Sequence, residues 1–181
     1  MADQATGLLS GLLRRKRLDA AKPFLRGRVL DYGCGVGELA PFCDPADYLG
    51  VDIDASSIAL AQANHPRYAF RTSMPDEGEF DLIVLLAVIE HVPDPVELLG
   101  RLRGLLGPEG RIVMTTPHRR AAWLHTLGAK IRLFSREASD EHETLFDLAM
   151  MHSAAGRAGL AIDRYRRFLF GVNQLFVVVR A

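Results

Sequence analysis

A glycine-rich stretch near the front of the chain constrains the fold more than any other feature. Residues 31–38 read Asp-Tyr-Gly-Cys-Gly-Val-Gly-Glu, with glycines at alternating positions. Residues 28–30 before the stretch favour a short β-strand, and residues from Leu39 on favour a helix. Glycines let a backbone turn tightly and leave no side chain above it. A helix start adds free N–H groups. Such a loop is typical of a site that holds part of a nucleotide-like ligand.

The composition is that of one ordinary globular domain. The 181 residues are 49% hydrophobic and 24% charged, which is enough for a full core, and we expect a single domain over residues 1–181. Formal net charge is zero, with 22 basic and 22 acidic residues. This balance argues against nucleic acid as the main partner, because a basic excess is expected there.

Cysteine usage and the N-terminal sequence indicate a cytoplasmic setting. Cys34 and Cys43 do not form a Cys-x-x-Cys pair, so we expect no zinc site. Cys34 lies within the glycine loop, where a disulfide would be awkward, and a reducing compartment fits. The N-terminus has no long apolar run, so we expect neither a signal peptide nor a membrane span.

Strand and helix patterns alternate along most of the chain. Predicted strands cover residues 28–30, 48–54, 68–71, 80–86, 111–116, 160–170 and 173–180. Predicted helices cover residues 3–24, 55–64 and 95–106, the segment from 39, and residues 144–158, with a turn at 107–110. The last two strands are joined so closely that they must be antiparallel. We predict an α/β fold: a doubly wound, mostly parallel seven-stranded sheet, Rossmann-like, with a C-terminal antiparallel hairpin.

Local signals set several helix boundaries. Asp54 is placed to cap the helix at 55–64, and Asp94 precedes Pro95 in a typical helix start. The last helix is expected to open at 144–147 and to bury Leu148 on the same face as Met151.

Two segments lie outside this alternation. Residues 1–24 form an N-terminal helical segment, and its basic run Arg14–Arg17 suits contact with an anionic membrane or a phosphorylated substrate. Such a run is more often a solvated helix face. Residues 118–143 mix apolar, charged and histidine residues. We interpret them as an insertion at the ligand end of the sheet, forming a lid or part of an acceptor site, and expect them to be more mobile than the sheet.

A second acid stands where a ribose partner is expected. Asp52 lies 19 residues after Gly33, at the tip of the second predicted strand. An acid about 20 residues past a glycine loop commonly binds ribose hydroxyls. Ligands of doubly wound sheets bind beyond the carboxyl ends of the strands, where Asp31, Asp52 and Glu90 all fall.

Four motifs together resemble the class I S-adenosylmethionine-dependent methyltransferases. Residues 29–37 resemble their first motif and residues 50–54 their second. Residues 80–92 resemble the fourth-strand motif, and residues 105–113 the turn and fifth strand. The resemblance implies S-adenosyl-L-methionine as cofactor, S-adenosyl-L-homocysteine as product, and a small-molecule acceptor of the quinone, lipid, glycan or natural-product type.

The resemblance also implies residue roles. The glycine loop would pack against the methionine part and the ribose, Asp31 would orient the methionine amino group, and Asp52 would bind both ribose hydroxyls. Ile53 would lie against adenine. The cofactor-binding residues implied are Asp31, Gly33, Cys34, Gly35, Gly37, Asp52, Ile53, Ser73, Met74 and Leu86. Residues 71–73 stand where the family often has an acid that contacts the adenine amino group.

Methyl transfer sets the demands on the rest of the site. A neutral thioether leaves, so no acid is needed, and a hydroxyl acceptor needs a base such as His, Asp or Glu. His118 and His142 are the main candidates, with His125 and His91 behind them. For each, the alternative is a solvated or hydrogen-bonded histidine.

Two other functions compete with this interpretation. The pattern Gly35-x-Gly37-x-x-Ala40 also fits an NAD(P)-dependent oxidoreductase, but the chain offers no second domain for its substrate. A non-catalytic methyltransferase-like binding protein is the other alternative. The acceptor, the methylated atom and the oligomeric state stay open.

Overall fold

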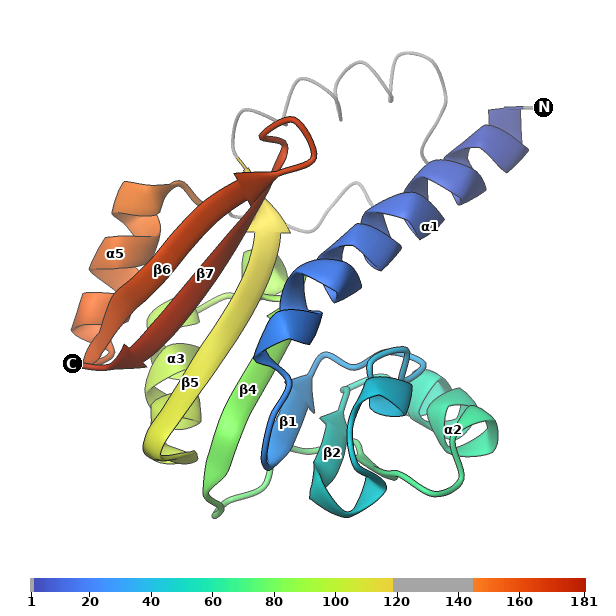
Figure 1. Cartoon of the computed structure of the whole chain (residues 1–181), viewed down its shortest axis with the longest axis horizontal. Helices are drawn as coiled ribbons and strands as arrows, with labels where there is room; N and C mark the ends of the chain where they lie inside the picture. Colours follow the sequence, from blue (N-terminus) through green and yellow to red (C-terminus); the bar gives the residue numbers. More distant parts are fainter. Residues whose placement is uncertain (1, 119–144) are drawn as a thin grey trace.

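The strands of the described residues form one seven-stranded sheet with the topology expected from the sequence. A computed structural model describes the backbone of residues 2–118 and 145–181, with side chains from residue 11 on. The strand order is β3-β2-β1-β4-β5-β7-β6, and β7 pairs antiparallel with both β5 and β6. The other pairs are parallel, which confirms the predicted fold class (Figure 1).

The elements have the following bounds. The strands are β1 (Val29–Tyr32), β2 (Tyr48–Val51), β3 (Ala69–Arg71), β4 (Phe80–Leu86), β5 (Leu106–Pro117), β6 (Leu160–Phe168) and β7 (Asn173–Arg180). The α-helices are α1 (Ala2–Ala21), α2 (Ala55–Asn64), α3 (Pro95–Gly104) and α5 (Leu148–Arg157). Short 3-10 helices are η1 (Lys22–Phe24), η2 (Ala40–Phe42), η3 (Pro45–Asp47) and η4 (Ile89–His91).

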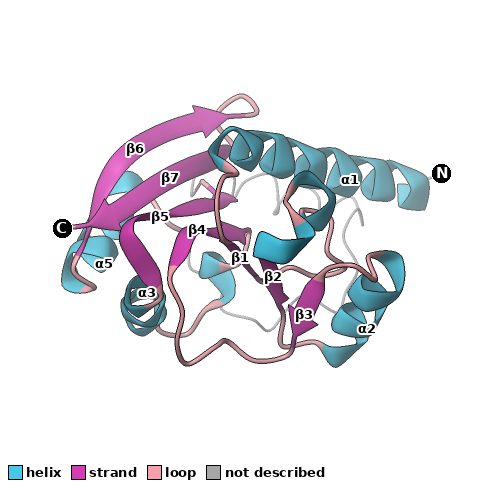
Figure 2. Ribbon diagram, turned by 60° about the horizontal axis from the view of Figure 1, so that its bottom comes forward, coloured by secondary structure: helices cyan, strands magenta, loops and turns pink. Residues whose placement is uncertain are grey.

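Hydrophobic cores lie on both faces of the sheet. Ile83 and Leu85 of β4 pack with α3 and α5 on one face, and Leu82 and Val84 pack with the end of α1 on the other. Figure 2 shows α1 on the face opposite α3 and α5. The continuous apolar run of β4 is therefore buried on both sides, as a strand between two helical layers requires.

Capping carboxylates begin the helices where the sequence places them. Asp54 accepts hydrogen bonds from the N–H groups of Ser56 (3.0 Å) and Ser57 (3.2 Å) at the start of α2. Asp94 does the same for α3 from the N–H groups of Val96 and Glu97, both at 3.0 Å. These local signals were sufficient because a cap needs only its own first turn.

The helix expected directly after the glycine loop is absent. Residues 38–47 contain only η2 and η3. Pro41 and Pro45 are the reason, since each lacks an N–H donor and together they divide the segment into pieces too short for an α-helix. The N–H groups that a full helix would offer to a ligand are therefore not supplied here.

The last helix begins later than expected. Asp147 caps α5 by accepting a hydrogen bond from the Met150 N–H at 2.9 Å. Leu148, predicted to be buried, is 43% exposed, because it occupies the first helical position at the solvent end. Met151, Ala154 and Ala155 make the buried face instead.

The turn expected at residues 107–110 is part of β5. The pairing of β5 with β4 shifts register between Phe80 and Leu82, so residues 107–110 form an irregularity within one long strand. A Cβ built on Gly110 would lie 2.6 Å from the Phe80 carbonyl oxygen and 3.1 Å from the Gly107 nitrogen. Glycine is required there because backbone atoms, which cannot swing away, fill the space.

This crowding predicts the effect of a single methyl group. Gly110→Ala should lower the free energy of unfolding by about 1–3 kcal/mol through overpacking. Gly100→Ala is the matched control, since a Cβ there meets nothing within 4 Å inside α3. It should leave stability unchanged or raise it by up to about 1 kcal/mol. Urea unfolding of both variants makes the comparison, and equal stability of the two would contradict the crowding at Gly110.

Candidate functional site

The glycine loop follows β1 and lies against the carboxyl end of β2. The N–H groups of Gly33 and Cys34 both donate to the Val51 carbonyl, at 2.7 and 3.0 Å. Gly33 and Gly37 have φ angles of +76° and +80°, which L side chains rarely adopt. The loop turns tightly for the reason that its glycine spacing predicted.

The three glycines face different surroundings. A Cβ on Gly33 would clash with Val88, and one on Gly37 would lie 2.8 Å from the ring of Phe70. A Cβ on Gly35 would meet nothing within 4 Å. The first and last glycines therefore pack against the protein, whereas Gly35 exposes bare backbone to open space.

Asp52 connects the glycine loop to the segment after β2. Its Oδ2 accepts a hydrogen bond from the Gly35 N–H at 2.8 Å, and its Oδ1 accepts one from the Asp54 N–H at 3.0 Å. An ionised carboxylate has about four acceptor positions. About two of them are left for a ligand.

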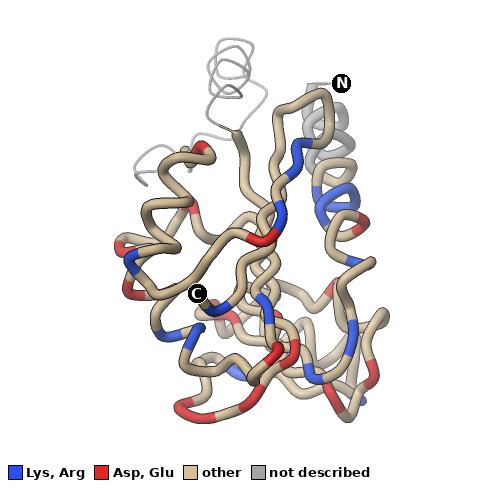
Figure 3. The backbone as a smooth tube through the Cα atoms, turned by 60° about the vertical axis from the view of Figure 1, so that its left-hand side comes forward, with Lys and Arg blue, Asp and Glu red and all other residues tan. Residues whose placement is uncertain are grey.

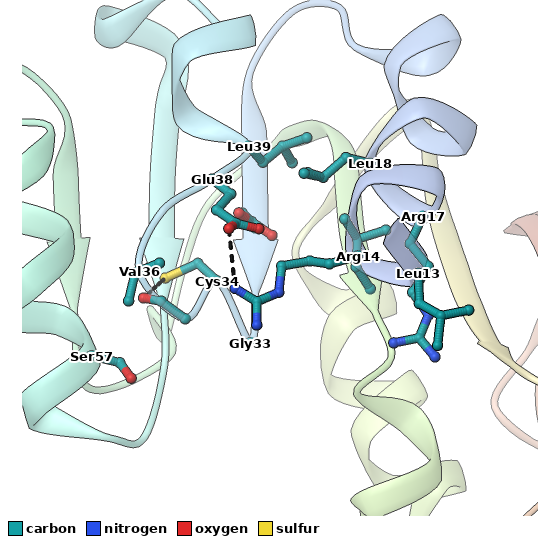
Figure 4. Close-up of a pocket in the computed structure, with 13 residues that line it drawn as sticks. Leu13, Arg14, Arg17, Leu18, Gly33, Cys34, Val36, Glu38, Leu39 and Ser57 are labelled. Carbon is teal, nitrogen blue, oxygen red and sulfur yellow. Dashed lines mark hydrogen bonds and ion pairs between the residues drawn. The ribbon is translucent and has the colours of Figure 1, made fainter. Parts of the chain in front are cut away.

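Two cavities adjoin at the loop, and both are lined by Gly33 and Leu86. The first, of about 430 Å³, lies between the loop and α1 (Figure 4). Its lining comprises Leu13, Arg14, Arg17, Leu18, Asp31, Gly33, Cys34, Gly35, Val36, Glu38, Leu39, Ser57 and Leu86. The second, of about 400 Å³, is lined by Tyr32, Gly33, Val51, Asp52, Ile53, Leu86, Ala87, Val88, His91, Val92 and Pro93. Asp31 and Asp52 thus border different cavities.

Helix α1 forms a wall of the first cavity, which the sequence analysis missed. Figure 4 shows Arg14 reaching from α1 to Glu38, and the two side chains form an ion pair at 3.1 Å. The Arg17 Nε donates to Asn173 Oδ1 at 3.0 Å. Leu13, Arg14, Arg17 and Leu18 share a helical spacing, so the face was visible in the sequence, but the element it contacts was not.

Asp31 is buried beside the cavity that it lines. Asp31 is only 3% exposed, and its Oδ2 accepts a hydrogen bond from the Tyr48 hydroxyl at 2.7 Å. Burial raises the pKa of Asp31 to about 7, with the Tyr48 hydrogen bond opposing that rise and the charge of Asp52 adding to it. Burial also raises the pKa values of Tyr48 and Cys34 above their usual ranges. Sequence reasoning did not find Tyr48, because it meets Asp31 only through the pairing of β1 with β2.

The second cavity contains a strained backbone position and an exposed side chain. Ala87, just past β4, has a φ of +60°, and its N–H donates to the Thr115 carbonyl at 2.8 Å. Non-glycine residues in this conformation cluster at functional sites. Ile53 is 88% exposed beside the same cavity, so its side chain is free to contact a ligand.

The remaining predicted site residues lie elsewhere. Ser73 is exposed and Met74 is half-buried against the core, and neither lines the two cavities. His118 directly follows β5, is 3% exposed and lines neither cavity. Its backbone N–H donates to the Val172 carbonyl at 2.9 Å. His142 and all but the first residue of the predicted lid at 118–143 lie outside the described residues.

The described residues contain neither a metal-ion cluster nor a membrane-spanning helix. No group of three or more His, Cys, Asp and Glu side chains within residues 2–118 and 145–181 is arranged to hold a metal ion. In the same ranges, no helix combines the length and apolar character needed to cross a membrane.

Comparison with known proteins gives matches over most of the chain. A family described as a methyltransferase domain matches residues 6–165. The ubiquinone biosynthesis O-methyltransferase of Acinetobacter baumannii (strain ACICU) is 28% identical over 168 residues, which is 83% of this chain and 70% of that protein. The protein of the same name from Bradyrhizobium sp. (strain ORS 278) is 36% identical over 105 residues, 51% of this chain and 40% of its own length. That second match thus spans less than half of the relative.

Solved structures share the fold. The magnesium protoporphyrin IX methyltransferase of Synechocystis PCC 6803, crystallised with bound S-adenosylhomocysteine (SAH), superposes with a TM-score of 0.71 at 20% identity. The match covers 94% of this chain and 84% of that one. An S-adenosylmethionine-dependent methyltransferase from Mesorhizobium loti superposes with a TM-score of 0.70 at 19% identity, covering 95% of this chain and 100% of that one.

The burial of Asp31 predicts a pH dependence of stability. Its pKa is about 7 in the folded protein against an ordinary value of 3.8, so between these values the folded state holds a proton that the unfolded chain releases. The bound proton therefore stabilises the folded state. This stabilisation is complete below about pH 4, is lost as the pH rises toward about 7, and does not change further above that pH. In Asp31→Asn the decrease in the free energy of unfolding between about pH 4 and 7 should be smaller than in the wild type. Asp76→Asn, at an exposed position, should show the same decrease as the wild type. Urea unfolding across the window tests this, and equal slopes for wild type and Asp31→Asn would disprove it.

Proposed function

The chain belongs to the methyltransferase domain family and is a class I S-adenosylmethionine-dependent methyltransferase, and from this premise we propose that it methylates a hydroxyl oxygen of a small quinone-type aromatic molecule. The observation that carries the proposal is the pair of adjoining cavities along the glycine loop, with Asp31 at one and Asp52 at the other. The names of the two bacterial relatives support the choice of an oxygen acceptor. Neither the oxidoreductase nor the non-catalytic alternative gains support from the matches.

The residues present fit S-adenosylmethionine. Gly35 offers backbone with open space above it, and Asp52 keeps about two acceptor positions suited to vicinal hydroxyls. We assign the methionine part to the first cavity, beside the buried Asp31, and the ribose and adenine to the second, beside Asp52 and Ile53. When bound, the cofactor supplies a methyl group on a positively charged sulfur.

The proposed contacts follow from this placement. Asp52 accepts from the ribose hydroxyls while it holds the loop through Gly35, and Ile53 covers one face of the adenine. The full set is Asp31, Gly33, Cys34, Gly35, Gly37, Asp52, Ile53 and Leu86, with Ser73 and Met74 near the adenine. Ser73 and Met74 depend on the cofactor extending past the second cavity, since they do not line it.

The chain must orient the acceptor and remove its proton. Because a neutral thioether leaves, most of the acceleration comes from holding the acceptor oxygen in line with the methyl group, an effect of about 7–11 kcal/mol at best. His118 and His142 stay the predicted bases. The burial of His118 means that its side chain reaches an acceptor only if the surroundings of β5 open. A cytoplasmic location and one domain over residues 1–181 also stay predictions.

Ligand-dependent melting tests the cofactor. S-adenosylmethionine and SAH, each at 100 times its dissociation constant, should add about 2.7 kcal/mol to the free energy of unfolding. For a domain of this size the melting temperature should rise by about 5–10 °C. NAD and NADP at the same concentrations are the controls and should leave it unchanged. A rise with NAD and none with either sulfur nucleotide would rule out the assignment. Transfer of labelled methyl from the cofactor to a panel of quinone-type phenols then tests the acceptor.

Substitution of Asp52 tests the site itself. Asp52→Ala should weaken SAH binding by about ten- to a hundredfold, because hydrogen bonds to a charged group contribute about 1.5–3 kcal/mol each. The loss also frees the Gly35 N–H, so some destabilisation should accompany it. Asp54→Ala is the matched control, since its carboxylate caps α2 and lines neither cavity. It should lower the melting temperature and leave affinity nearly unchanged. Calorimetric titration of both variants with SAH measures the two affinities. Weaker binding by Asp54→Ala and unchanged binding by Asp52→Ala would mean that Asp54, and not Asp52, holds the ribose.

A further inference from the structure

An aromatic side chain at the tip of the β6–β7 hairpin is fully exposed to solvent among the described residues. Leu169 and Phe170 have φ angles of +52° and +55°, a left-handed conformation that non-glycine residues rarely adopt. Phe170 has a relative exposure of 107%, so no part of the described chain covers it. Strained backbone persists where surrounding structure or function demands it. The tip therefore presents an apolar side chain that the described residues leave uncovered.

Basic side chains of α1 and β6 flank this tip. A groove of about 480 Å³ beside it is lined by Lys16, Asp19 and Ala20 from α1 and by Arg166, Phe168, Leu169 and Phe170 from the hairpin. Figures 1 and 3 show α1 lying beside the hairpin. Among the described residues that line the groove, the one acid is Asp19, and it accepts a hydrogen bond from Lys22 Nζ at 2.9 Å. The groove therefore combines two exposed cations with apolar side chains.

Arg166 links the two elements. Its Nη2 donates to the Ala20 carbonyl at 3.4 Å, and its guanidinium lies 5.9 Å from the centre of the Phe168 ring. The Arg166 side chain is thereby held on the α1 face of β6, next to Phe168. We call Lys16, Arg166, Phe168, Leu169 and Phe170 the tip patch.

The tip patch lies at the same edge of the sheet as the cofactor site. Asn173, at the start of β7, pairs with Phe168 of β6 and with Pro117 at the end of β5. Since β5 runs parallel to β4, and β4 to β1, the hairpin tip lies at the carboxyl edge of these strands. Any flat surface that the tip contacts is thereby near the edge that carries the glycine loop.

We propose that the tip patch docks the protein on an anionic lipid bilayer. Phe170 and Leu169 enter the boundary between headgroups and acyl chains, a position that suits aromatic and apolar side chains. Lys16 and Arg166 contact anionic headgroups, whose surface potential attracts basic side chains. The chain as a whole has no net charge, so the attraction depends on this local excess of positive charge. The proposal does not depend on which acceptor is methylated.

Co-sedimentation with vesicles tests the proposal. The chain of residues 1–181 should partition onto phosphatidylcholine vesicles that contain phosphatidylglycerol, much less onto phosphatidylcholine alone, and less as salt is added. Phe170→Ser and Lys16→Glu should each lower the partition coefficient about tenfold or more. The effect of Lys16→Glu should fade at high salt, whereas that of Phe170→Ser should persist, because salt screens charge and not apolar burial.

Matched controls change similar side chains elsewhere. Leu60→Ser removes an apolar side chain that is 55% exposed on α2, and Arg67→Glu reverses an exposed charge in the loop after it. Both should keep wild-type partitioning, and all four variants should keep the wild-type melting temperature and SAH affinity. Equal binding to neutral and anionic vesicles, or wild-type binding by Phe170→Ser, would overturn the proposal. So would a dimer, found by light scattering, that Phe170→Ser dissociates, since a second copy would then be the occupant.

Discussion

The carboxylate of Asp52 fixes the relative positions of the two loops that make the site. Pairing of β1 with β2 brings these loops to one edge of the sheet, but it ends at Tyr32 and Val51, before either loop begins. Beyond that point the Val51 carbonyl accepts from Gly33 and Cys34, and Asp52 accepts from Gly35 on the glycine loop and from the Asp54 N–H on its own loop, at 2.8 and 3.0 Å. Charge-assisted hydrogen bonds are about twice as strong as neutral ones. The Asp52 side chain therefore links the glycine loop to the loop that follows β2.

Two aspartates that flank the glycine loop have opposite surroundings. Asp52 is partly exposed and accepts hydrogen bonds from backbone N–H groups, whereas Asp31 is buried against Tyr48 with its pKa raised to about 7. Asp52 thus offers accessible acceptor oxygens to hydroxyl groups of a ligand. Asp31 offers a carboxyl whose charge is favoured when a cation enters the cavity beside it. Residue type alone does not distinguish these roles, and burial does.

Local patterns predicted much of the fold and the conformation of the glycine loop. The glycine loop, the Asp52 position and the caps at Asp54 and Asp94 depend on a few neighbouring residues, and the structure has them where the sequence indicated. Pro41 is a local signal of the same kind. It disfavours an α-helix directly after the loop, and the expectation of a helix there did not take it into account. The wrong prediction of a turn at residues 107–110 has a different cause. The irregularity in β5 there depends on the Phe80 backbone, which is distant in the sequence.

Contacts between distant segments could not be predicted. The Tyr48–Asp31 hydrogen bond depends on strand register, and the Arg14–Glu38 ion pair depends on the direction in which α1 crosses the sheet. Hydrophobic periodicity gives the faces of α1 but not their partners. The wall of the first cavity was therefore missed although every residue in it was plain in the sequence.

Helix α1 presents one side to the cofactor cavity, through Arg14 and Leu18, and another to the tip patch, through Lys16. Two binding events that share one rigid element obey thermodynamic reciprocity. If contact with a surface at Lys16 repositions α1 and changes cofactor affinity by some factor, cofactor in the cavity must change affinity for that surface by the same factor. Because α1 borders both the cofactor cavity and the tip patch, such a shift would couple cofactor occupancy to attachment at the tip.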